Sequence, residues 1–323
     1  MKILITGVAG FIGSNLAKEL LSRDHEIVGI DNLSYGSLIN IEEIHNHKNF
    51  EFIQGDICNP LLLKDIKADL VVHLASQKIP RYSSAYRTLE ENSIMLKNIV
   101  NKCVSDKCKL LFASTSDVYG KNKELPFKED SNFVLGDSTV KRWAYALSKI
   151  YGEQYIIANS DEFDLNYTIV RFFGSYGPNQ NLTWWGGPQS LFINKAFNNE
   201  SIDIHGDGSQ TRTFTFIEDT VAALVLCIES NKSDKEIFNI ASDPKEEITI
   251  LNLGKLIWGL INGNESEAKI NFVPYASFGK YEDVERRVPC IDKLQKFFDY
   301  KPKYTLEEGL KRTIEWQKQR EKK

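Results

Sequence analysis

Residues 1–31 of the chain read MKILITGVAGFIGSNLAKELLSRDHEIVGID. Residues 2–6 predict a strand, and residues 7–13 predict a tight glycine loop. A helix follows, because apolar residues then recur every four positions, and a second strand at 26–30 leads directly into Asp31. This order is typical of the first βαβ unit of a dinucleotide-binding fold.

Each glycine of the loop has a separate physical task in such a unit. Gly7 makes the tight turn that a side chain would obstruct, Gly10 lets the backbone approach a pyrophosphate, and Gly13 allows close packing of helix on strand. The helix begins near Phe11 and Ile12, whose free N–H groups and positive dipole end would face the phosphates. A glycine turn of another α/β protein is the alternative, and the surrounding order argues against it.

Asp31 predicts which nicotinamide cofactor is bound. A carboxylate at the end of the second strand accepts hydrogen bonds from both ribose hydroxyls of the adenosine half. The same charge would repel the additional phosphate of NADP. The sequence therefore predicts NAD.

The bulk composition excludes several classes of protein. The 323 residues are enough for about two domains, and their 42% hydrophobic and 26% charged content is ordinary for a globular protein. A net charge of −4 gives no basic field for nucleic acid or anionic membranes. The five scattered cysteines and five histidines have no metal-site spacing, and we expect reduced thiols, surface histidines and no metal. With no signal peptide or long apolar run, we expect a cytoplasmic protein.

The first half of the chain alternates between strand and helix patterns. Further strands are predicted at 50–53, 70–75, 109–113 and 167–172, with a helix at about 85–103. This alternation predicts an α/β fold, a Rossmann-type doubly wound parallel sheet. We expect an NAD-binding domain at 1–174 and a smaller mixed α/β substrate domain at 175–323, from which some segments return to the first domain.

Three residues predict redox chemistry on a hydroxyl group. Tyr145 and Lys149 are four positions apart and share one face of a helix, and Thr115 follows the fifth strand. A phenol is a poor base at neutral pH, but a nearby ammonium and a positive nicotinamide ring both favour the phenolate. Tyr145 would then take a proton from a substrate hydroxyl while the carbon that bears this hydroxyl loses a hydride to NAD. Thr115 would form a hydrogen bond with the same oxygen.

The motifs together resemble the extended short-chain dehydrogenase/reductases, the NAD-dependent nucleotide-sugar epimerase/dehydratase family. The resemblance covers nearly the whole chain, and its segments are TGVAGFIG at 6–13, Asp56, HLA at 73–75, STSDVYG at 114–120, Tyr145-x-x-x-Lys149, RFFGSYGP at 171–178, GDGSQTRTF at 206–214 and FNI at 238–240. It implies a Rossmann domain, tightly held NAD, and oxidation at C4 of a nucleoside-diphosphate sugar. It also implies a homodimer formed through the long helices after the fourth and fifth strands.

The same resemblance assigns residues to the site. The catalytic set is Thr115, Tyr145 and Lys149, with Asp117 as a further candidate. NAD would contact Gly7, Gly10, Phe11, Ile12, Gly13, Asp31, Asn32, Asp56, Ile57, Leu74, Ala75, Tyr145 and Lys149. The resemblance places Arg212 and Arg287 on the substrate's diphosphate, and the further substrate candidates in the sequence are Lys78, Ser116, Trp184 and Trp185.

The branch of the family stays open between three reactions. We expect a 4-epimerase first. Segments 141–145 and 280–289 are similar to UDP-glucuronate decarboxylases. Decarboxylation would require a cation near the C6 carboxylate, and the candidates are Lys78 and Arg81 after the fourth strand, unless they are solvated loop charges. A 4,6-dehydratase would use Asp117 as its acid or base, although this side chain is shorter than the glutamate of those enzymes. The alternative for Asp117 is a cap on a neighbouring backbone turn.

Two departures from the family pattern, together with an unusual tryptophan loop, point to a specific sugar that the sequence does not identify. Gly174 replaces an asparagine, and Thr213 replaces an aspartate. The pair Trp184 and Trp185 would either stack on the sugar or base, or close an apolar lid. The rival from another class is a non-catalytic NAD-binding sensor, which would have no chemical need for Tyr145.

Overall fold

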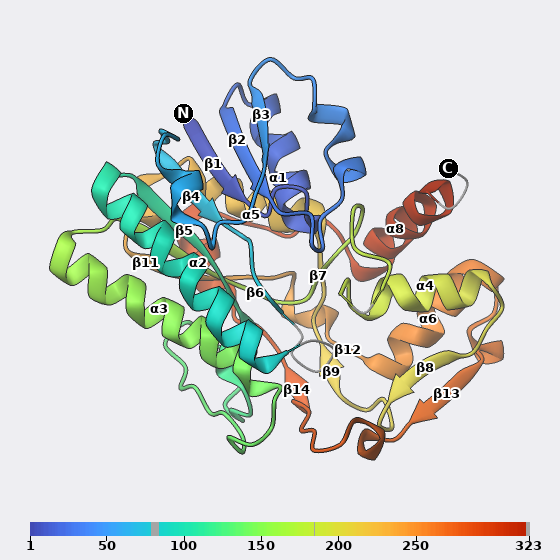
Figure 1. Ribbon diagram of the computed structural model, residues 1–323. Coiled ribbons are helices and arrows are strands. Elements are labelled where there is room, and N and C mark those ends of the chain that lie inside the picture. The colour runs from blue at the N-terminus through green and yellow to red at the C-terminus, as the bar shows by residue number, and fades with distance from the viewer. Residues whose placement is uncertain (79–83, 184, 321–323) are drawn as a thin grey trace. The chain divides into compact units, whose positions relative to one another are not determined.

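A parallel sheet forms the centre of the first half of the chain. The computed structural model describes residues 1–78, 84–183 and 185–320. Seven strands lie in the order β11-β6-β5-β4-β1-β2-β3, and all their pairings are parallel (Figure 1). The strands are β1 (Lys2–Thr6), β2 (Glu26–Asp31), β3 (Phe50–Gln54), β4 (Leu70–His73), β5 (Lys109–Thr115), β6 (Tyr167–Phe172) and β11 (Glu236–Ile240). The Rossmann-type doubly wound sheet predicted from the sequence is confirmed.

Helices cover both faces of this sheet, so its central strands are almost entirely buried. Helices α2 and α3 pack side by side on one face, and α1 and α5 cover the other (Figure 1). Their bounds are α1 (Phe11–Ser22), α2 (Ala85–Asp106), α3 (Trp143–Phe163) and α5 (Ile217–Ile228). All four residues of β4 are buried, as expected for a parallel strand between two helical layers.

The sequence patterns place six strands correctly and miss one. β4 ends two residues earlier than expected, whereas β5 continues through the polar residues Ser114 and Thr115. The unpredicted strand is β11, which pairs with β6 and places Asn239 opposite Arg171. Its partner lies far away in the sequence, so local periodicity does not show the pairing.

The strand order reverses between β1 and β4, which sets the position of the site. β2 and β3 continue on one side of β1, and β4, β5, β6 and β11 on the other. In open α/β sheets, ligands bind at the carboxyl ends of the strands at such a switch point. The residues that follow these ends are Gly7, Leu74 and Ser116.

The chain forms two compact units, each built from three segments. The first unit comprises residues 1–118, 141–172 and 221–240, and the second comprises 119–140, 173–220 and the residues from 241 onward. The boundary expected at residue 174 lies two residues after the end of β6, and segment 221–240 returns to the first unit with β11.

The second unit contains small sheets and helices. β9 pairs antiparallel with β12 and parallel with β14, so its pairing is mixed. Two further pairs, β7 with β10 and β8 with β13, are parallel. The elements are β7 (Ser175–Tyr176), α4 (Pro188–Phe197), β8 (Ile202–His205), β9 (Thr211–Arg212), β10 (Thr215–Phe216), β12 (Ile248–Thr249), α6 (Ile250–Asn262), β13 (Ile270–Val273), β14 (Arg286–Arg287), α7 (Asp292–Phe298) and α8 (Leu306–Arg320).

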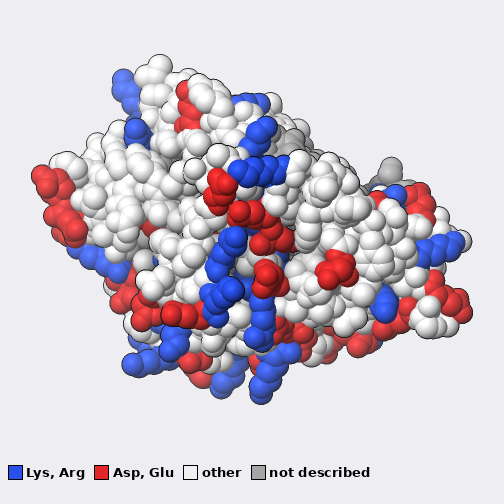
Figure 2. Space-filling view, turned by 90° about the horizontal axis from the view of Figure 1, so that it is seen from below, with Lys and Arg blue, Asp and Glu red and all other residues white. Residues whose placement is uncertain are grey.

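The face drawn in Figure 2 carries charges of both signs. Lysine and arginine side chains lie interspersed with aspartate and glutamate on the face drawn in Figure 2, in keeping with the net charge of −4. In the part of the chain that the structure describes, no helix has both the length and the apolar character needed to cross a membrane.

Candidate active site

The glycine loop has the shape that a pyrophosphate requires. Gly7 has a φ of +76°, a conformation that side chains disfavour, and its N–H donates to the Ile30 carbonyl at 2.7 Å. A Cβ on Gly13 would lie 2.2 Å from the Gly7 oxygen, so the helix can approach the loop only with glycine there. α1 begins at Phe11, directly after its N-cap Gly10. The first-turn amides of Phe11 and the next residues therefore form an anion site at the end of β1.

Asp31 ties the end of β2 to this loop. Its carboxylate accepts hydrogen bonds from the amides of Ala9 at 3.0 Å and Leu33 at 2.8 Å. Burial raises the pKa of Asp31, and these amides oppose that shift. A carboxylate has about four lone-pair directions, so it can still accept from ribose hydroxyls. A buried anion beside the loop fits NAD and excludes an added phosphate.

The other expected cofactor residues follow neighbouring strands. Asn32 donates to Asp56 at 3.1 Å, and the amide of Cys58 donates to the other carboxylate oxygen at 2.8 Å. Ile57, between Asp56 and Cys58 in the sequence, is buried. Leu74 and Ala75 lie against the glycine loop, because a Cβ on Gly7 would come within 2.9 Å of the Ala75 nitrogen. These positions fit a dinucleotide that lies across the strand ends, and the individual contacts stay predictions.

Thr115, Tyr145 and Lys149 come together at the end of β5. Thr115 is the last residue of that strand, and its hydroxyl and that of Ser76 form hydrogen bonds with the Tyr145 hydroxyl. Lys149 lies one turn further along α3, with its Nζ 5.8 Å from the centre of the Tyr145 ring and 4.9 Å from that of Phe112. The arrangement joins a phenol, a hydroxyl and a cation around one point.

Burial works against both charged forms in this arrangement. It raises the pKa of Tyr145, and the Asp117 carboxylate raises it further, whereas the hydrogen bonds with Thr115 and Ser76 lower it. It lowers the pKa of Lys149 to about 7, against the opposing effect of Glu153. The phenolate expected from the sequence therefore needs positive charge beyond that of Lys149. A bound oxidised nicotinamide ring supplies such a charge.

Asp117 forms an ion pair that the sequence does not show. Its Oδ1 lies 3.2 Å from Nη2 of Arg142, the residue that precedes α3, and both side chains are more than two-thirds buried. Arg142 also lies over the Trp143 ring, 5.1 Å from its centre. The carboxylate that opposes the Tyr145 phenolate is thus partly compensated by a guanidinium.

A second charged pair lies behind Lys149. Glu153 and Arg171 are each 2% exposed and form two hydrogen bonds, at 3.0 Å and 2.7 Å. Ser114 donates to the same glutamate at 2.5 Å. Sequence reasoning missed this pair, although the spacing of Tyr145, Lys149 and Glu153, four residues each, is a visible signal.

His73, like His25 at 8% exposure, corrects the expectation that all histidines lie on the surface. It ends β4, is 2% exposed, and its Nδ1 lies 2.8 Å from the Thr6 hydroxyl. Burial lowers its pKa to about 3, and the Lys149 charge acts in the same direction. His73 is therefore a neutral imidazole at the sheet's carboxyl edge.

The second unit brings two expected substrate residues together. Arg212 in β9 and Arg287 in β14 are register partners in neighbouring parallel strands. Arg212 also forms an ion pair with Asp283 at 3.1 Å, and the Tyr275 hydroxyl donates to the same carboxylate at 2.6 Å. Two adjacent guanidinium groups can bind a diphosphate. Their substrate role stays a prediction.

The structure does not distinguish between the possible roles of the remaining expected residues. Ser116 is buried directly after Thr115. Lys78, after β4, is exposed as a residue, yet burial of its ammonium group lowers its pKa to about 8. Trp185 is half-buried, so stacking and lid roles both stay open. Trp184 and Arg81 lie outside the described residues.

The structure gives a reason for one of the two departures from the family pattern. Gly174 has a φ of +55°, and a Cβ there would lie 3.0 Å from Phe214 Cδ1. Thr213 is buried at 2% exposure. Glycine at 174 thus suits a left-handed turn against an aromatic ring.

Comparison with known proteins agrees with this geometry. Residues 3–241 match the model of the NAD dependent epimerase/dehydratase family. The chain is 33% identical over 321 residues to a UDP-N-acetyl-alpha-D-glucosaminuronate decarboxylase of Bacillus cytotoxicus, covering 98% of this chain and 97% of that one. It is 34% identical over 317 residues to UDP-glucuronic acid decarboxylase 1 of Danio rerio, covering 98% of this chain and 72% of that one.

A solved structure extends the likeness to the whole fold. The UDP-glucuronic acid 4-epimerase of Bacillus cereus, in complex with UDP-glucuronic acid and NAD, superposes with a TM-score of 0.87. It is 28% identical, and the match covers 99% of each chain. The glycine loop, the acid at the end of β2 and the Thr115–Tyr145–Lys149 arrangement are thus found in a chain that belongs to the NAD-dependent epimerase/dehydratase family of enzymes.

Proposed function

We propose that this enzyme oxidises C4 of a nucleoside-diphosphate sugar, with Tyr145 as the base that accepts the C4 hydroxyl proton. The observation that carries the proposal is the hydrogen-bonded group of Tyr145 and Thr115 beside the buried Lys149. NAD, when bound, accepts the hydride from C4. The comparisons support the substrate class, because the named relatives act on or bind UDP-sugars.

The residues divide the proton transfer between them. The Thr115 hydroxyl fixes the oxygen from which Tyr145 removes the proton. The Lys149 ammonium stabilises the negative charge that develops on the phenol. Its near-complete burial strengthens this effect, because little water screens a charge that is 3% exposed.

We place decarboxylation first among the fates of the resulting ketone. A C4 ketone lies two carbons from a C6 carboxylate, so the pair of electrons released with carbon dioxide can move onto the ketone oxygen. A uronic acid sugar therefore needs only the first oxidation to become labile. Two relatives that align with 98% of this chain are named decarboxylases of such sugars, and this reverses the ranking expected from the sequence alone.

The second candidate is the 4-epimerase that the sequence analysis ranks first. A solved structure with the same fold is a 4-epimerase bound to UDP-glucuronic acid, the same class of sugar. Dehydration ranks third, because the ion pair with Arg142 favours the ionised form of Asp117. An ionised carboxylate cannot protonate a leaving hydroxyl group.

Arg212 and Arg287 are the groups that we propose for the diphosphate. They lie opposite one another in paired strands, so their guanidinium groups can form charge-assisted hydrogen bonds with adjacent phosphates. Asp283 holds Arg212 in place from the side.

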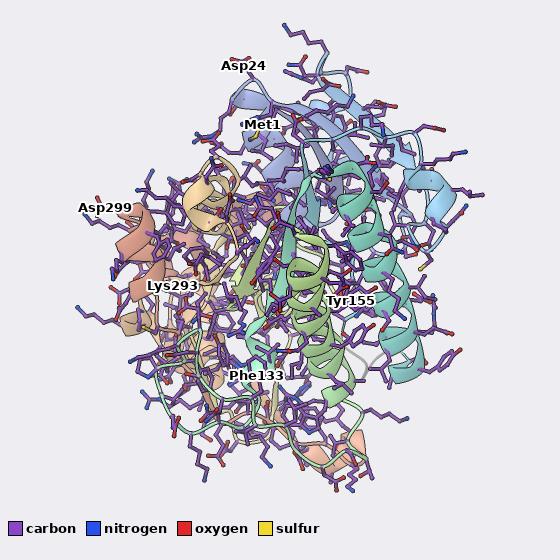
Figure 3. The ribbon with its side chains drawn as sticks, turned by 90° about the vertical axis from the view of Figure 1, so that its left-hand side faces the viewer. Met1, Asp24, Phe133, Tyr155, Lys293 and Asp299 are labelled. Carbon is purple, nitrogen blue, oxygen red and sulfur yellow. The ribbon has the colours of Figure 1, made fainter. Side chains whose placement is uncertain are left out.

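We propose a homodimer formed through α2 and α3. The two helices pack together, and Figure 3 shows them side by side, with Tyr155 labelled on α3. Large apolar side chains stay exposed on them, including Tyr86 at 68% and Leu147 at 49%.

Sedimentation should give twice the mass of one chain, and Leu147→Lys should lower the measured mass to that of one chain. Leu61→Lys, an exposed leucine outside both helices, is the control. A single-chain mass for the unaltered protein would contradict the dimer.

The fate of the ketone is tested by the mass of the product. Purified enzyme is incubated with UDP-glucuronate and UDP-N-acetylglucosaminuronate, and with UDP-, GDP-, CDP- and dTDP-hexoses as controls. We expect loss of carbon dioxide from a uronate, detected by mass spectrometry. An isomer of unchanged mass would support the 4-epimerase instead, and loss of water would support the dehydratase.

Tyr145→Phe separates an enzyme from an NAD-binding sensor. Loss of the phenolic oxygen removes the base, so turnover should fall about 10²- to 10⁴-fold. NAD affinity, measured by tryptophan fluorescence, should fall far less than turnover, because the glycine loop and Asp31 are unchanged. Tyr151→Phe on the same helix is the matched control, since Tyr151 stacks on Tyr155 and is exposed. Full turnover by Tyr145→Phe would exclude the proposed base.

A further inference from the structure

A buried ion pair lies one helical turn beyond Lys149, and the proposed reaction does not use it. Glu153 follows Lys149 by four residues on α3, so Tyr145, Lys149 and Glu153 lie along one face. From β6, Arg171 donates through Nε to one carboxylate oxygen at 3.0 Å and through Nη2 to the other at 2.7 Å. Ser114, the residue before Thr115 on β5, donates to Oε1 at 2.5 Å. Hydrogen bonds from two strands, β5 and β6, thus hold the Glu153 carboxylate of α3 in place.

Such a pair is a costly way to fill a core. Both partners are 2% exposed, and replacement of a buried ion pair by apolar residues of similar volume is often neutral or stabilising. Stability alone therefore gives no reason for charges at these positions. A reason exists if a nearby group requires a fixed negative charge.

Lys149 is that group. Its side chain is 3% exposed, and its Nζ contacts the face of Phe112, which compensates a cation only in part. Burial lowers the pKa of Lys149 to about 7, and the Glu153 charge is what opposes this shift. Without the carboxylate, the lysine would lose its proton more readily at neutral pH.

The other ionisable groups around Lys149 do not replace this charge. His73 on β4 is neutral because burial lowers its pKa to about 3. Asp117 acts on Tyr145 and is paired with Arg142. Arg171 carries a positive charge and opposes a second cation.

We propose that Glu153, held by Arg171 and Ser114, is a positioning residue that keeps Lys149 in its ammonium form beside Tyr145. The inference rests on the proposed function, in which Tyr145 is the base. It gives a reason for an ion pair that lies outside the residues proposed to contact substrate or cofactor.

Two variants with opposite effects on the local charge test the proposal. Glu153→Gln removes the negative charge, so Lys149 should lose its proton at lower pH, and the alkaline limb of kcat/KM should move down by about one pH unit. Arg171→Gln leaves the carboxylate uncompensated, so Lys149 should hold its proton longer and the same limb should move up. A pair with only a structural role predicts losses of stability and activity in both variants with no opposite displacement of the limb.

Controls separate folding from charge. Thermal unfolding and NAD affinity by tryptophan fluorescence establish that each variant is folded and binds the cofactor. If a single variant does not fold, Glu153→Met combined with Arg171→Met removes both charges, and the limb should still move to lower pH. An unmoved limb in the double variant, or displacement of both single variants in the same direction, would overturn the proposal. Full turnover by Tyr145→Phe would instead overturn the proposed function.

Discussion

The active site depends on holding one cation, Lys149, in a place where water hardly reaches it. Burial favours its neutral form, yet the proposed chemistry needs the ammonium beside a phenol. The protein meets this requirement with fixed groups rather than solvent: the Phe112 ring on one side and the Glu153 carboxylate one turn along the helix. Because α3 carries both Lys149 and Tyr145, the packing of this helix on β5 and β6 sets the geometry of the reaction.

Two ion pairs act on the charge states of Lys149 and Tyr145 in opposite ways. Glu153 with Arg171 is sealed in the core behind Lys149, whereas Asp117 with Arg142 lies nearer the surface at the start of α3. Glu153 favours the lysine cation, and Asp117 opposes the tyrosine anion. In each case an arginine limits how far the carboxylate acts. The resting site is therefore biased toward a neutral phenol, and bound oxidised cofactor adds the positive charge that shifts this balance.

The sequence predicted the parts of this arrangement that are encoded locally. The glycine loop, the acid at the end of β2 and six strands follow from short patterns, and the tyrosine–lysine spacing identifies one helix face. Strand β11 and the partners of Asp117 and Glu153 were missed, since each contact joins residues that are distant in the chain. His73 was expected on the surface from its residue type alone, although its place in an apolar strand between two helical layers is itself a signal of burial.

The most direct test of the account is the destination of the hydrogen on C4. A UDP-uronate that carries deuterium at C4 is converted in ordinary water, and the products and the cofactor are analysed by mass spectrometry. Removal as hydride, with Tyr145 taking only the hydroxyl proton, predicts that the deuterium is recovered in the sugar product or in reduced NAD. Recovery of the deuterium in water would mean that C4 loses a proton instead, and would contradict the assignment of Tyr145, Thr115 and Lys149 to C4 oxidation.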